Sequence, residues 1–377
     1  MRRAAGIVLA GGALILAAYA FANAELLVAG IGFALLGGIA GPWMWVAGRA
    51  AAVSRSIDAE QVVEDQPLEA RIEVRGGPLG LPGAEILDSL AGAPIRLEAS
   101  AGRLAGRSSE IRVIGRFPRR GWQRLDAPRL ALADPLGLVR IVRTSAAGPQ
   151  SVLVLPRIER LRWLEGPRGD QLDRHNGAPG LEAFAALEVD GLRPYRPGTP
   201  ASRISWNALA RGAGLLERRL RADRDAGPLV VLDLRSDGPS EDIDAAVRAA
   251  ASLTHELARR TGCELLLPGE RRPLQIGADM GAWPAAHARL ALVAGGPDSP
   301  VPWPGPAVRT GAVFYVSAQV ARMPARLGRG AHGGLVLVLP VTVTPTQRAT
   351  PRFEVAGCRG YLITDRGAMA RQNERVA

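Results

Sequence analysis

The chain of 377 residues contains no lysine, so all 47 of its basic residues are arginines. The absence of lysine excludes a Ser–Lys catalytic pair and a Walker-type phosphate loop, whose lysine contacts the phosphates. The two cysteines, Cys263 and Cys358, provide no zinc-site spacing, require no disulfide and fit a reducing compartment. Four histidines are scattered along the chain with none in a recognisable motif: His175, His255, His287 and His332. The sequence therefore predicts neither an enzyme nor a cofactor.

The formal net charge is +11, and abundant alanine, glycine and proline accompany the arginines. This composition is typical of GC-rich coding, which makes the positive charge a weak indicator of a nucleic-acid partner. We expect instead an arginine-rich face that pairs with acidic side chains or with an anionic membrane surface.

The N-terminal region contains two long uncharged segments, residues 4–24 and residues 26–48. Each is long enough to cross a hydrocarbon core of about 30 Å at about 1.5 Å per helical residue. Residues 23–25 separate them, which predicts a tight helical hairpin within residues 1–55 and a lipid bilayer as a partner. The second segment holds two glycines that allow close helix contact and two tryptophans suited to the membrane interface: Gly37, Gly41, Trp43 and Trp45.

The basic residues that flank these segments predict their orientation. Arg2 and Arg3 precede the first segment, and Arg49 and Arg55 follow the second, whereas the hairpin tip has no basic residue. The positive-inside rule therefore places both ends in the cytoplasm, on the inner side of the plasma membrane. A cleavable signal peptide ending at Ala22-Asn23-Ala24 is an alternative, but the second segment would still return the chain to the cytoplasm.

Residues 56–156 change to short alternating runs, such as Leu68–Arg75 and Glu110–Arg116. Alternation with a period of two, broken by Gly/Pro turns, predicts half-buried strands in a small antiparallel β-sandwich of the immunoglobulin type. The block Asp134–Arg140, reading DPLGLVR, favours a turn. We expect this turn to be architectural, with a ligand role for Asp134 as the alternative.

An arginine-rich segment, residues 157–227, follows. The Pro197-Gly198 pair suits a type II turn, Thr199 can cap a helix with Pro200 at its first position, and Gly212 can end that helix. We expect a binding surface built from seven residues of this segment: Arg193, Tyr195, Arg196, Gly198, Arg203, Trp206 and Arg211.

Two interpretations of these arginines remain open. They form either a cationic surface for an acidic loop, a phosphate or a partner protein, or an internal lattice of ion pairs. Asp190, Asp223 and Asp225 are the acids available nearby for such a lattice.

The segment resembles the central motif of the bacterial family called domain of unknown function 58. That motif runs L-R-x-Y-R-P-G-D and then R-I-D-W-K-x-x-A-R, and the Asp134–Arg140 block resembles the family's D-P-F-G-L-F-R. Thr199, Pro200 and Ser205 replace family acids, and Asn207 replaces the usual lysine. The resemblance implies a von Willebrand factor A-like (vWA-like) domain and a role beside MoxR-type AAA+ ATPases.

Residues 228–377 alternate between strands and helices, with strands expected at 229–232, 263–267, 312–316, 335–340 and 359–363 and helices at 242–260 and 283–294. This alternation predicts an α/β domain with a mostly parallel sheet and helices on both faces, as in a vWA-like fold. Metal-binding members of that fold carry D-x-S-x-S after the first strand. The matching residues are Asp233, Arg235 and Asp237, and the arginine predicts that no metal binds there.

The fold class expected for the whole chain is therefore α+β multidomain. The function expected is that of a membrane-anchored cytoplasmic interaction or adaptor protein in an envelope-related process, acting with an AAA+ ATPase. The alternatives are an enzyme of unrecognised type and an arginine-rich membrane protein that binds nucleic acid.

Overall fold

The computed structural model of the protein describes residues 2–76, 83–97, 108–164, 189–195, 204–212, 214–220, 227–303, 312–320, 335–345 and 350–363. The chain separates into two compact units. The first comprises residues 1–118 and 122–154, and the second comprises residues 119–121 and 155–377.

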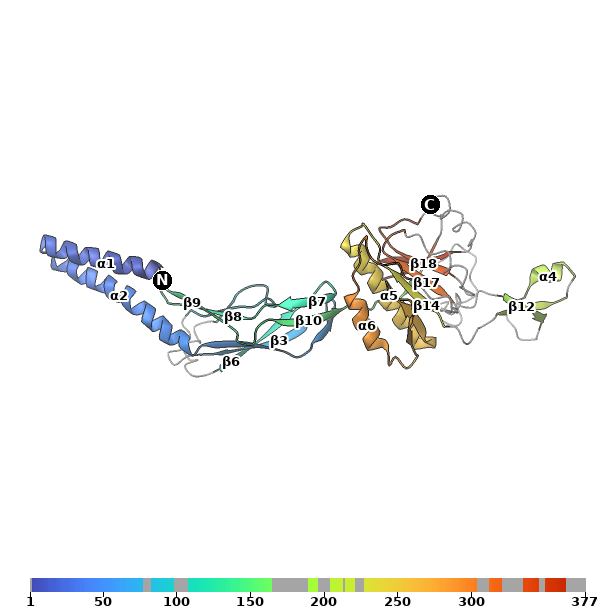
Figure 1. The fold of residues 1–377 in the computed structure, drawn as a ribbon, viewed down its shortest axis with the longest axis horizontal. Helices are drawn as coiled ribbons and strands as arrows, with labels where there is room; N and C mark the ends of the chain where they lie inside the picture. The colour runs from blue at the N-terminus through green and yellow to red at the C-terminus, as the bar shows by residue number, and fades with distance from the viewer. Residues whose placement is uncertain are drawn as a thin grey trace. The chain divides into compact units, whose positions relative to one another are not determined.

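The first unit begins with two antiparallel helices, α1 (Arg2–Phe21) and α2 (Ala24–Arg49) (Figure 1). Asn23 caps α2, because its side-chain oxygen accepts hydrogen bonds from the backbone N–H groups of Glu25 (2.9 Å) and Leu26 (3.3 Å). Both helices are long and apolar enough to cross a membrane, and most of their apolar residues are exposed. They are therefore not the core helices of this unit.

Glycines bring the two helices into close contact. A Cβ atom at Gly30 would lie 2.8 Å from Ile15 Cγ1 and 2.9 Å from Gly11 O, and one at Gly37 would lie 2.8 Å from Ala4 O. The expected close approach at Gly37 is thus confirmed. At Gly41 it is wrong, because nothing lies within 4 Å of that position. The contact repeats every seven residues, so Gly37 lies on the contact face and Gly41 does not.

The rest of the first unit is a β domain built from antiparallel sheets, as the alternating runs indicate. Two of its sheets have the orders β1–β3–β6 and β5–β4–β8–β9, and a third has the order β2–β10–β7. In β3 every second residue is buried, as expected from its sequence. The strands are β1 (Ala52–Ile57), β2 (Gln61–Val63), β3 (Leu68–Arg75), β4 (Glu85–Leu87), β5 (Ile95–Arg96), β6 (Ser108–Gly115), β7 (Gly121–Leu125), β8 (Arg129–Ala133), β9 (Arg140–Thr144) and β10 (Gln150–Leu155).

The last turns of α2 pack on the β domain. Met44 is fully buried and shares one hydrophobic cluster with residues of the strands. A Cβ atom at Gly48 would lie 3.6 Å from Leu132 and 3.7 Å from Ile141, and Arg143 Nε donates to Gly48 O at 3.0 Å. The helical hairpin and the β domain are therefore continuous in packing as well as in sequence.

The second unit contains an eight-stranded sheet with the order β11–β19–β20–β18–β17–β14–β15–β16. The four strands β15, β14, β17 and β18 are mutually parallel, and the outer strands pair antiparallel. The expected parallel sheet is thus limited to the centre. The strands are β11 (Arg162–Trp163), β14 (Leu229–Asp233), β15 (Cys263–Leu266), β16 (Leu274–Ile276), β17 (Val313–Ser317), β18 (Leu335–Pro340), β19 (Pro351–Val355) and β20 (Cys358–Ile363).

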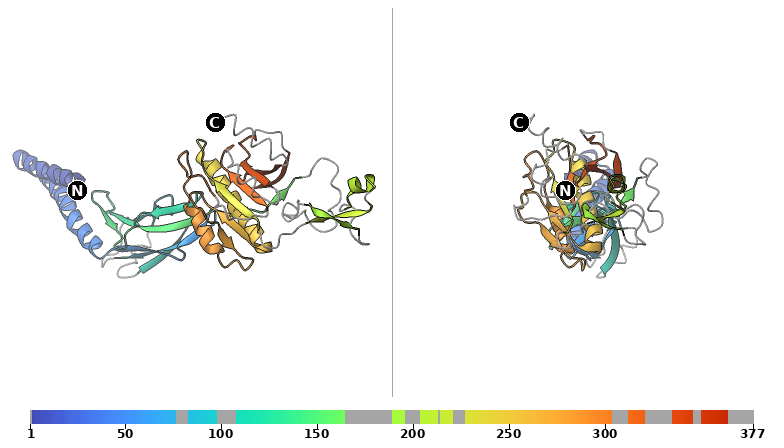
Figure 2. Two further views of the ribbon diagram at one scale, coloured as in Figure 1. Left: turned by 45° about the vertical axis from the view of Figure 1, so that its right-hand side comes forward. Right: turned by 90° about the vertical axis from the view of Figure 1, so that its right-hand side faces the viewer.

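The helices α5 (Ser240–Thr261) and α6 (Trp283–Leu292) pack on one face of this sheet (Figure 2). Alternate strand residues such as Val230 and Phe314 meet them, whereas Leu229 and Tyr315 belong to a separate cluster on the other face. Helices were expected on both faces, but among the described residues of this unit none covers the second face.

Candidate functional site

A charged cluster lies at the carboxyl end of β14. Asp233, the last residue of that strand, is fully buried. Its Oδ1 accepts hydrogen bonds from Arg235 N (3.1 Å) and Arg235 Nε (3.0 Å). Its Oδ2 accepts from Arg235 Nη2 (2.7 Å) and from the hydroxyl of Tyr315 (2.5 Å). The carboxylate is therefore held by a bidentate guanidinium and a phenol.

The topology of the sheet places this cluster where ligands commonly bind. The chain leaves β14 toward β15 on one side, while β17 lies on its other side, so the strand order reverses at β14. Ligands of open α/β sheets bind beyond the carboxyl ends of the strands at such a switch point. Asp233 pairs in register with Ser317 at the end of β17, and both are buried.

The electrostatics of the cluster follow from its burial and its pairing. Burial raises the pKa of Tyr315 well above its ordinary value, and the charge of Asp233 adds to the effect. The hydrogen bond to Asp233 raises the pKa of Arg235 further above its already high value. The phenol therefore stays protonated and the guanidinium stays charged. The Arg235 side chain is one quarter exposed, so solvent reaches part of it.

Asp233 and Asp237, the two acids that the sequence matches to a metal-binding motif, differ in their surroundings. Asp233 is buried and paired with Arg235, whereas Asp237 is exposed. The guanidinium occupies the hydrogen-bonding positions of the carboxylate that a cation would require. Among the described residues no group of three or more His, Cys, Asp or Glu side chains is placed to hold a metal ion.

The arginine-rich segment contributes a hairpin, which we call the signature hairpin. It comprises the antiparallel strands β12 (Val189–Pro194) and β13 (Leu216–Leu220) with the short helix α4 (Trp206–Ala210) between them. Arg193 lies in β12 opposite Glu217, and Tyr195 N donates to Leu215 O at 3.0 Å. Arg196, Gly198 and Arg203 lie outside the described residues, as do Thr199 and Pro200.

The helix of this hairpin is shorter than expected. It begins at Trp206 after Ser205, because Ile204 forms a β-bridge with Glu217 and Ser205 N donates to Leu216 O at 2.8 Å. The expected start at Pro200 is therefore wrong: strand pairing continues through Ile204. The expected end is confirmed, since Gly212 has a positive φ of 75° and follows the last turn.

The hairpin has both buried and exposed residues. Ile204, Ser205, Ala208 and Glu217 are buried. Trp206 is 58% exposed, Leu209, Leu215 and Arg211 are also exposed, and Tyr195 is half-buried. We call the exposed set Trp206, Leu209, Arg211 and Leu215 the hairpin patch.

Sequence reasoning missed two features of these sites. Glu217, the buried acid of the signature hairpin, is not one of the acids considered from the sequence. Tyr315 reaches Asp233 across 82 positions of sequence, a separation that no local pattern reveals.

Two histidines that look scattered in the sequence share one aromatic group. The rings of His255 and Trp283 meet edge to face at 5.2 Å, and His287 stacks on the same indole at 4.8 Å. His287 Nε2 lies 2.7 Å from Pro156 O, and burial lowers the pKa of both imidazoles. No local motif indicates this pair, because its members are far apart in the sequence. Its contacts are those of packing, with burial favouring the neutral rings.

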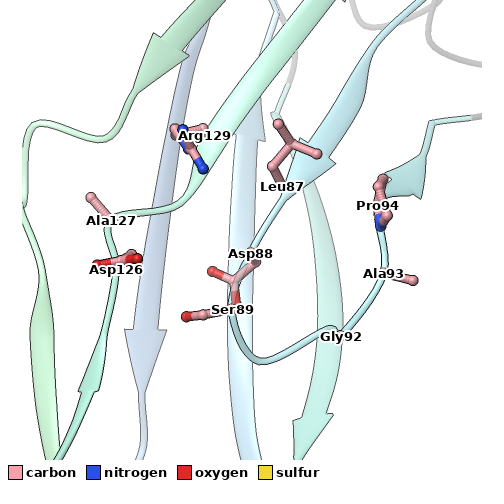
Figure 3. Close-up of a pocket in the computed structure, with 9 residues that line it drawn as sticks. All are labelled: Leu87, Asp88, Ser89, Gly92, Ala93, Pro94, Asp126, Ala127 and Arg129. Carbon is pink, nitrogen blue, oxygen red and sulfur yellow. The ribbon is translucent and has the colours of Figure 1, made fainter.

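A pocket of about 280 Å³ lies in the β domain, between the loop from Leu87 to Pro94 and the residues Asp126–Arg129 (Figure 3). Asp88, which lines it, is committed elsewhere: its Oδ2 accepts from Arg55 Nη1 at 2.7 Å and its Oδ1 accepts from Leu90 N at 2.8 Å. The side chains of Asp88 and Arg55 are both fully buried. This carboxylate therefore fixes the loop rather than facing a ligand.

Comparisons with known proteins give little similarity. No family model and no curated protein matches the sequence. The CARDB domain of the PF1109 protein from Pyrococcus furiosus, solved in complex with di-metal ions, aligns with 28% of this chain and 87% of its own, at 13% identity and a TM-score of 0.20. Cwp6 from Clostridium difficile aligns with 70% of this chain and 33% of its own, at 10% identity and a TM-score of 0.17.

Proposed function

We propose that this protein is a membrane-anchored cytoplasmic interaction protein that recruits or presents a protein partner. Its helices α1 and α2 form the anchor. Their exposed apolar side chains, such as Leu9, Leu16 and Val28, support this role, because helices that leave most of their apolar surface uncovered require an apolar solvent. The arginines at both ends of the hairpin support a cytoplasmic location for the β domain and the C-terminal unit.

The fold that we propose for the C-terminal unit is vWA-like. Reading the central strands as β16–β15–β14–β17–β18 gives the order of a doubly wound sheet, with an antiparallel edge strand at β16. We propose an immunoglobulin-like sandwich for the β domain on the basis of its antiparallel sheets with one shared core. Together with the sequence resemblance, these features support membership of the domain of unknown function 58 family.

The observation that carries the interaction role is the hairpin patch. Trp206 is largely exposed on a helix of five residues, next to an exposed arginine and two exposed leucines. Tryptophan and arginine are the residues most enriched at the centres of protein interfaces. A folded hairpin that buries Ile204 and Glu217 while leaving its tryptophan in water is suited to docking.

We propose a MoxR-type AAA+ ATPase as the partner and an envelope-related process as the setting. The partner surface that suits the hairpin patch is an apolar groove with an acidic rim, because the patch combines an indole, two leucines and a guanidinium. The partly exposed guanidinium of Arg235 at the end of β14 provides a second contact for an acidic side chain.

Co-purification from native membranes tests the proposal. The full-length wild type and a Trp206→Ala/Arg211→Ala variant are extracted gently, and co-purifying proteins are quantified by mass spectrometry. Trp122→Ala, which removes an equally exposed indole from the β domain, is the matched control. We expect an AAA+ ATPase with the wild type and the control and its loss with the double variant. Equal recovery in all three samples would reject the hairpin patch as the docking surface.

A further inference from the structure

The turn between β8 and β9 has a rigid form that presents one leucine to solvent. Asp134 Oδ1 accepts from Leu136 N at 2.9 Å, and its Oδ2 accepts from Val139 N. Gly137 N donates to Asp134 O at 2.9 Å, with Gly137 at a φ of 67°. These bonds give Asp134 an architectural role within the turn. Leu136 is nevertheless 63% exposed, so the turn holds an apolar side chain in water.

Contacts within the first unit indicate the direction in which this turn lies. Arg55 Nη2 donates to Leu125 O at 3.3 Å, whereas Gly48 meets Leu132. Arg55 lies beside Leu125 and Gly48 lies beside Leu132, so residues 48–55 and residues 125–132 run in opposite directions. The turn that follows β8 must continue along α2 toward residues that precede Gly48.

Burial and the figures agree with this direction. Leu138 and Val139 are buried in the hydrophobic cluster that contains Met44 and Ala4. Figure 1 and the left view of Figure 2 show the β8–β9 end of the β domain beside the start of α1.

The level of Met44 coincides with the expected membrane surface. About 20 helical residues cross the hydrocarbon core, so a span that starts after Glu25 ends near Trp45. The guanidinium carbon of Arg49 lies 4.8 Å from the Trp45 ring centroid, an aromatic–basic pair typical of the interface. The Arg140 side chain, which follows the turn, is also more than half exposed, and its Nη2 lies 3.4 Å from Glu85 Oε2.

We propose that the β8–β9 turn is a membrane contact: Leu136 inserts into the interface of an anionic bilayer, and Arg49 and Arg140 face its phosphate groups. This inference rests on the proposed membrane anchor, because α1 and α2 must cross the same bilayer. The β domain is then held against the membrane by the two helices and by this turn. The exposed leucine, the direction of the turn and the neighbouring arginines all favour a lipid surface over a protein partner.

Depth-dependent quenching in lipid nanodiscs tests this contact with the full-length protein. A bimane probe is attached to Leu136→Cys, and the discs contain phosphatidylcholine, phosphatidylglycerol and a lipid with a nitroxide near the headgroup. The native thiols of Cys263 and Cys358 stay unlabelled, because both are buried and burial raises the pKa of each to about 12. Ile114→Cys is the matched control: its side chain is 59% exposed on the same β domain.

The registers place Ile114 at the opposite end of the strands. Ala52, three residues after α2, pairs with Arg75 and through it with Ser108, whereas Ile114 pairs with Glu69 near the far end of β3. We expect several-fold stronger quenching at position 136 than at 114, and stronger quenching in anionic than in neutral discs. Equal quenching at 136 and 114 would overturn the contact, and equal quenching in both discs would remove the arginines from it.

Two further probes separate the possible failures. Leu36→Cys, near the middle of the expected α2 span, reports whether the helix crosses the bilayer in discs whose nitroxide lies deep in the acyl chains. Quenching at position 36 without quenching at 136 would overturn the turn contact alone, whereas its absence at both would overturn the anchor as well. Pro135→Cys repeats the test at the neighbouring exposed position, and we expect it to be quenched like position 136.

Discussion

Each unit of the protein contains a buried aspartate held by an arginine, and the two pairs differ in what surrounds them. The pair Arg55–Asp88 has no exposed side-chain surface and joins segments 33 residues apart, with further bonds from Arg55 to Gln150 Oε1 (3.0 Å) and Leu125 O. In the pair Asp233–Arg235 the partners are two residues apart, and the guanidinium is one quarter exposed.

The difference indicates different roles. Arg55 links several segments of the β domain, so its charge serves the fold and reaches no partner. Arg235 fixes one carboxylate at the end of a strand and keeps part of its guanidinium in solvent, where an acidic group of a partner can reach it. A buried ion pair is by itself weak evidence of stability. Removing one member of each pair tests how strongly the fold depends on the charge that remains.

The largest expected effect comes from Asp88→Ala. The substitution leaves the Arg55 guanidinium buried without its carboxylate, so we expect the free energy of unfolding of the first unit to fall by about 3–5 kcal/mol. Denaturant unfolding in detergent, followed by circular dichroism, measures the change. A loss no greater than that of an exposed substitution would show that Arg55 reaches water in the folded state.

We expect Asp233→Ala to lower the free energy of unfolding by less than Asp88→Ala does. The Arg235 side chain can turn to solvent, so the main loss is the acceptor of the buried Tyr315 hydroxyl, which costs about 1–3 kcal/mol. Tyr315→Phe in the Asp233→Ala background is the control, because it removes the unsatisfied hydroxyl and recovers part of the loss. A larger loss than with Asp88→Ala would reverse the assignment of roles.

The pair His255 and His287 gives the second unit a dependence on pH. Burial holds the folded-state pKa of His287 below its ordinary value, so its contribution to stability is fully present above the unfolded-state pKa of about 6.5. That contribution is lost as the pH falls through the folded-state pKa. We expect thermal unfolding to shift to lower temperature from pH 7 to pH 5, with a shallower slope in His287→Phe. Identical slopes would assign the pH dependence to other groups.

The smallest expected change in stability is that of Trp206→Ala. The indole is mostly exposed, so the free energy of unfolding should change by no more than about 0.5 kcal/mol. Denaturant unfolding compares this variant with Ile204→Ala, which empties a buried position of the same hairpin. A loss as large as that of Ile204→Ala would make Trp206 a packing residue of the hairpin.

The sequence predicted the regular elements of this protein well, because their hydrophobic periodicity is strong. The alternating run Leu68–Arg75 is β3 itself, and the apolar run at 335–340 is β18. The expected helix at 242–260 is α5, extended by a few residues. The short outer strands β11, β16 and β19 were not predicted, because they lack the continuous apolar run that identified central strands of similar length.

The contacts of the sites were less predictable, because they join distant parts of the chain. The sequence shows that Arg235 follows Asp233 by two residues. It does not show that Arg235 binds the Asp233 carboxylate in a bidentate manner, or that the Tyr315 hydroxyl donates to the same carboxylate. Tertiary pairing also overrode local preference at Ile204, where a strand bridge displaced the expected helix start. Of the seven residues expected to form the binding surface, Trp206 and Arg211 are exposed in the described hairpin.

Site-specific photo-cross-linking in living cells tests directly whether a partner protein docks on the hairpin patch. A photoreactive phenylalanine analogue replaces Trp206 in one strain and Trp122 in another, and cross-linked proteins are identified by mass spectrometry. We expect a cross-link from position 206 to one AAA+ ATPase and none from position 122. The absence of any protein cross-link at 206 above the level at 122 would contradict the role of the hairpin patch as a docking surface.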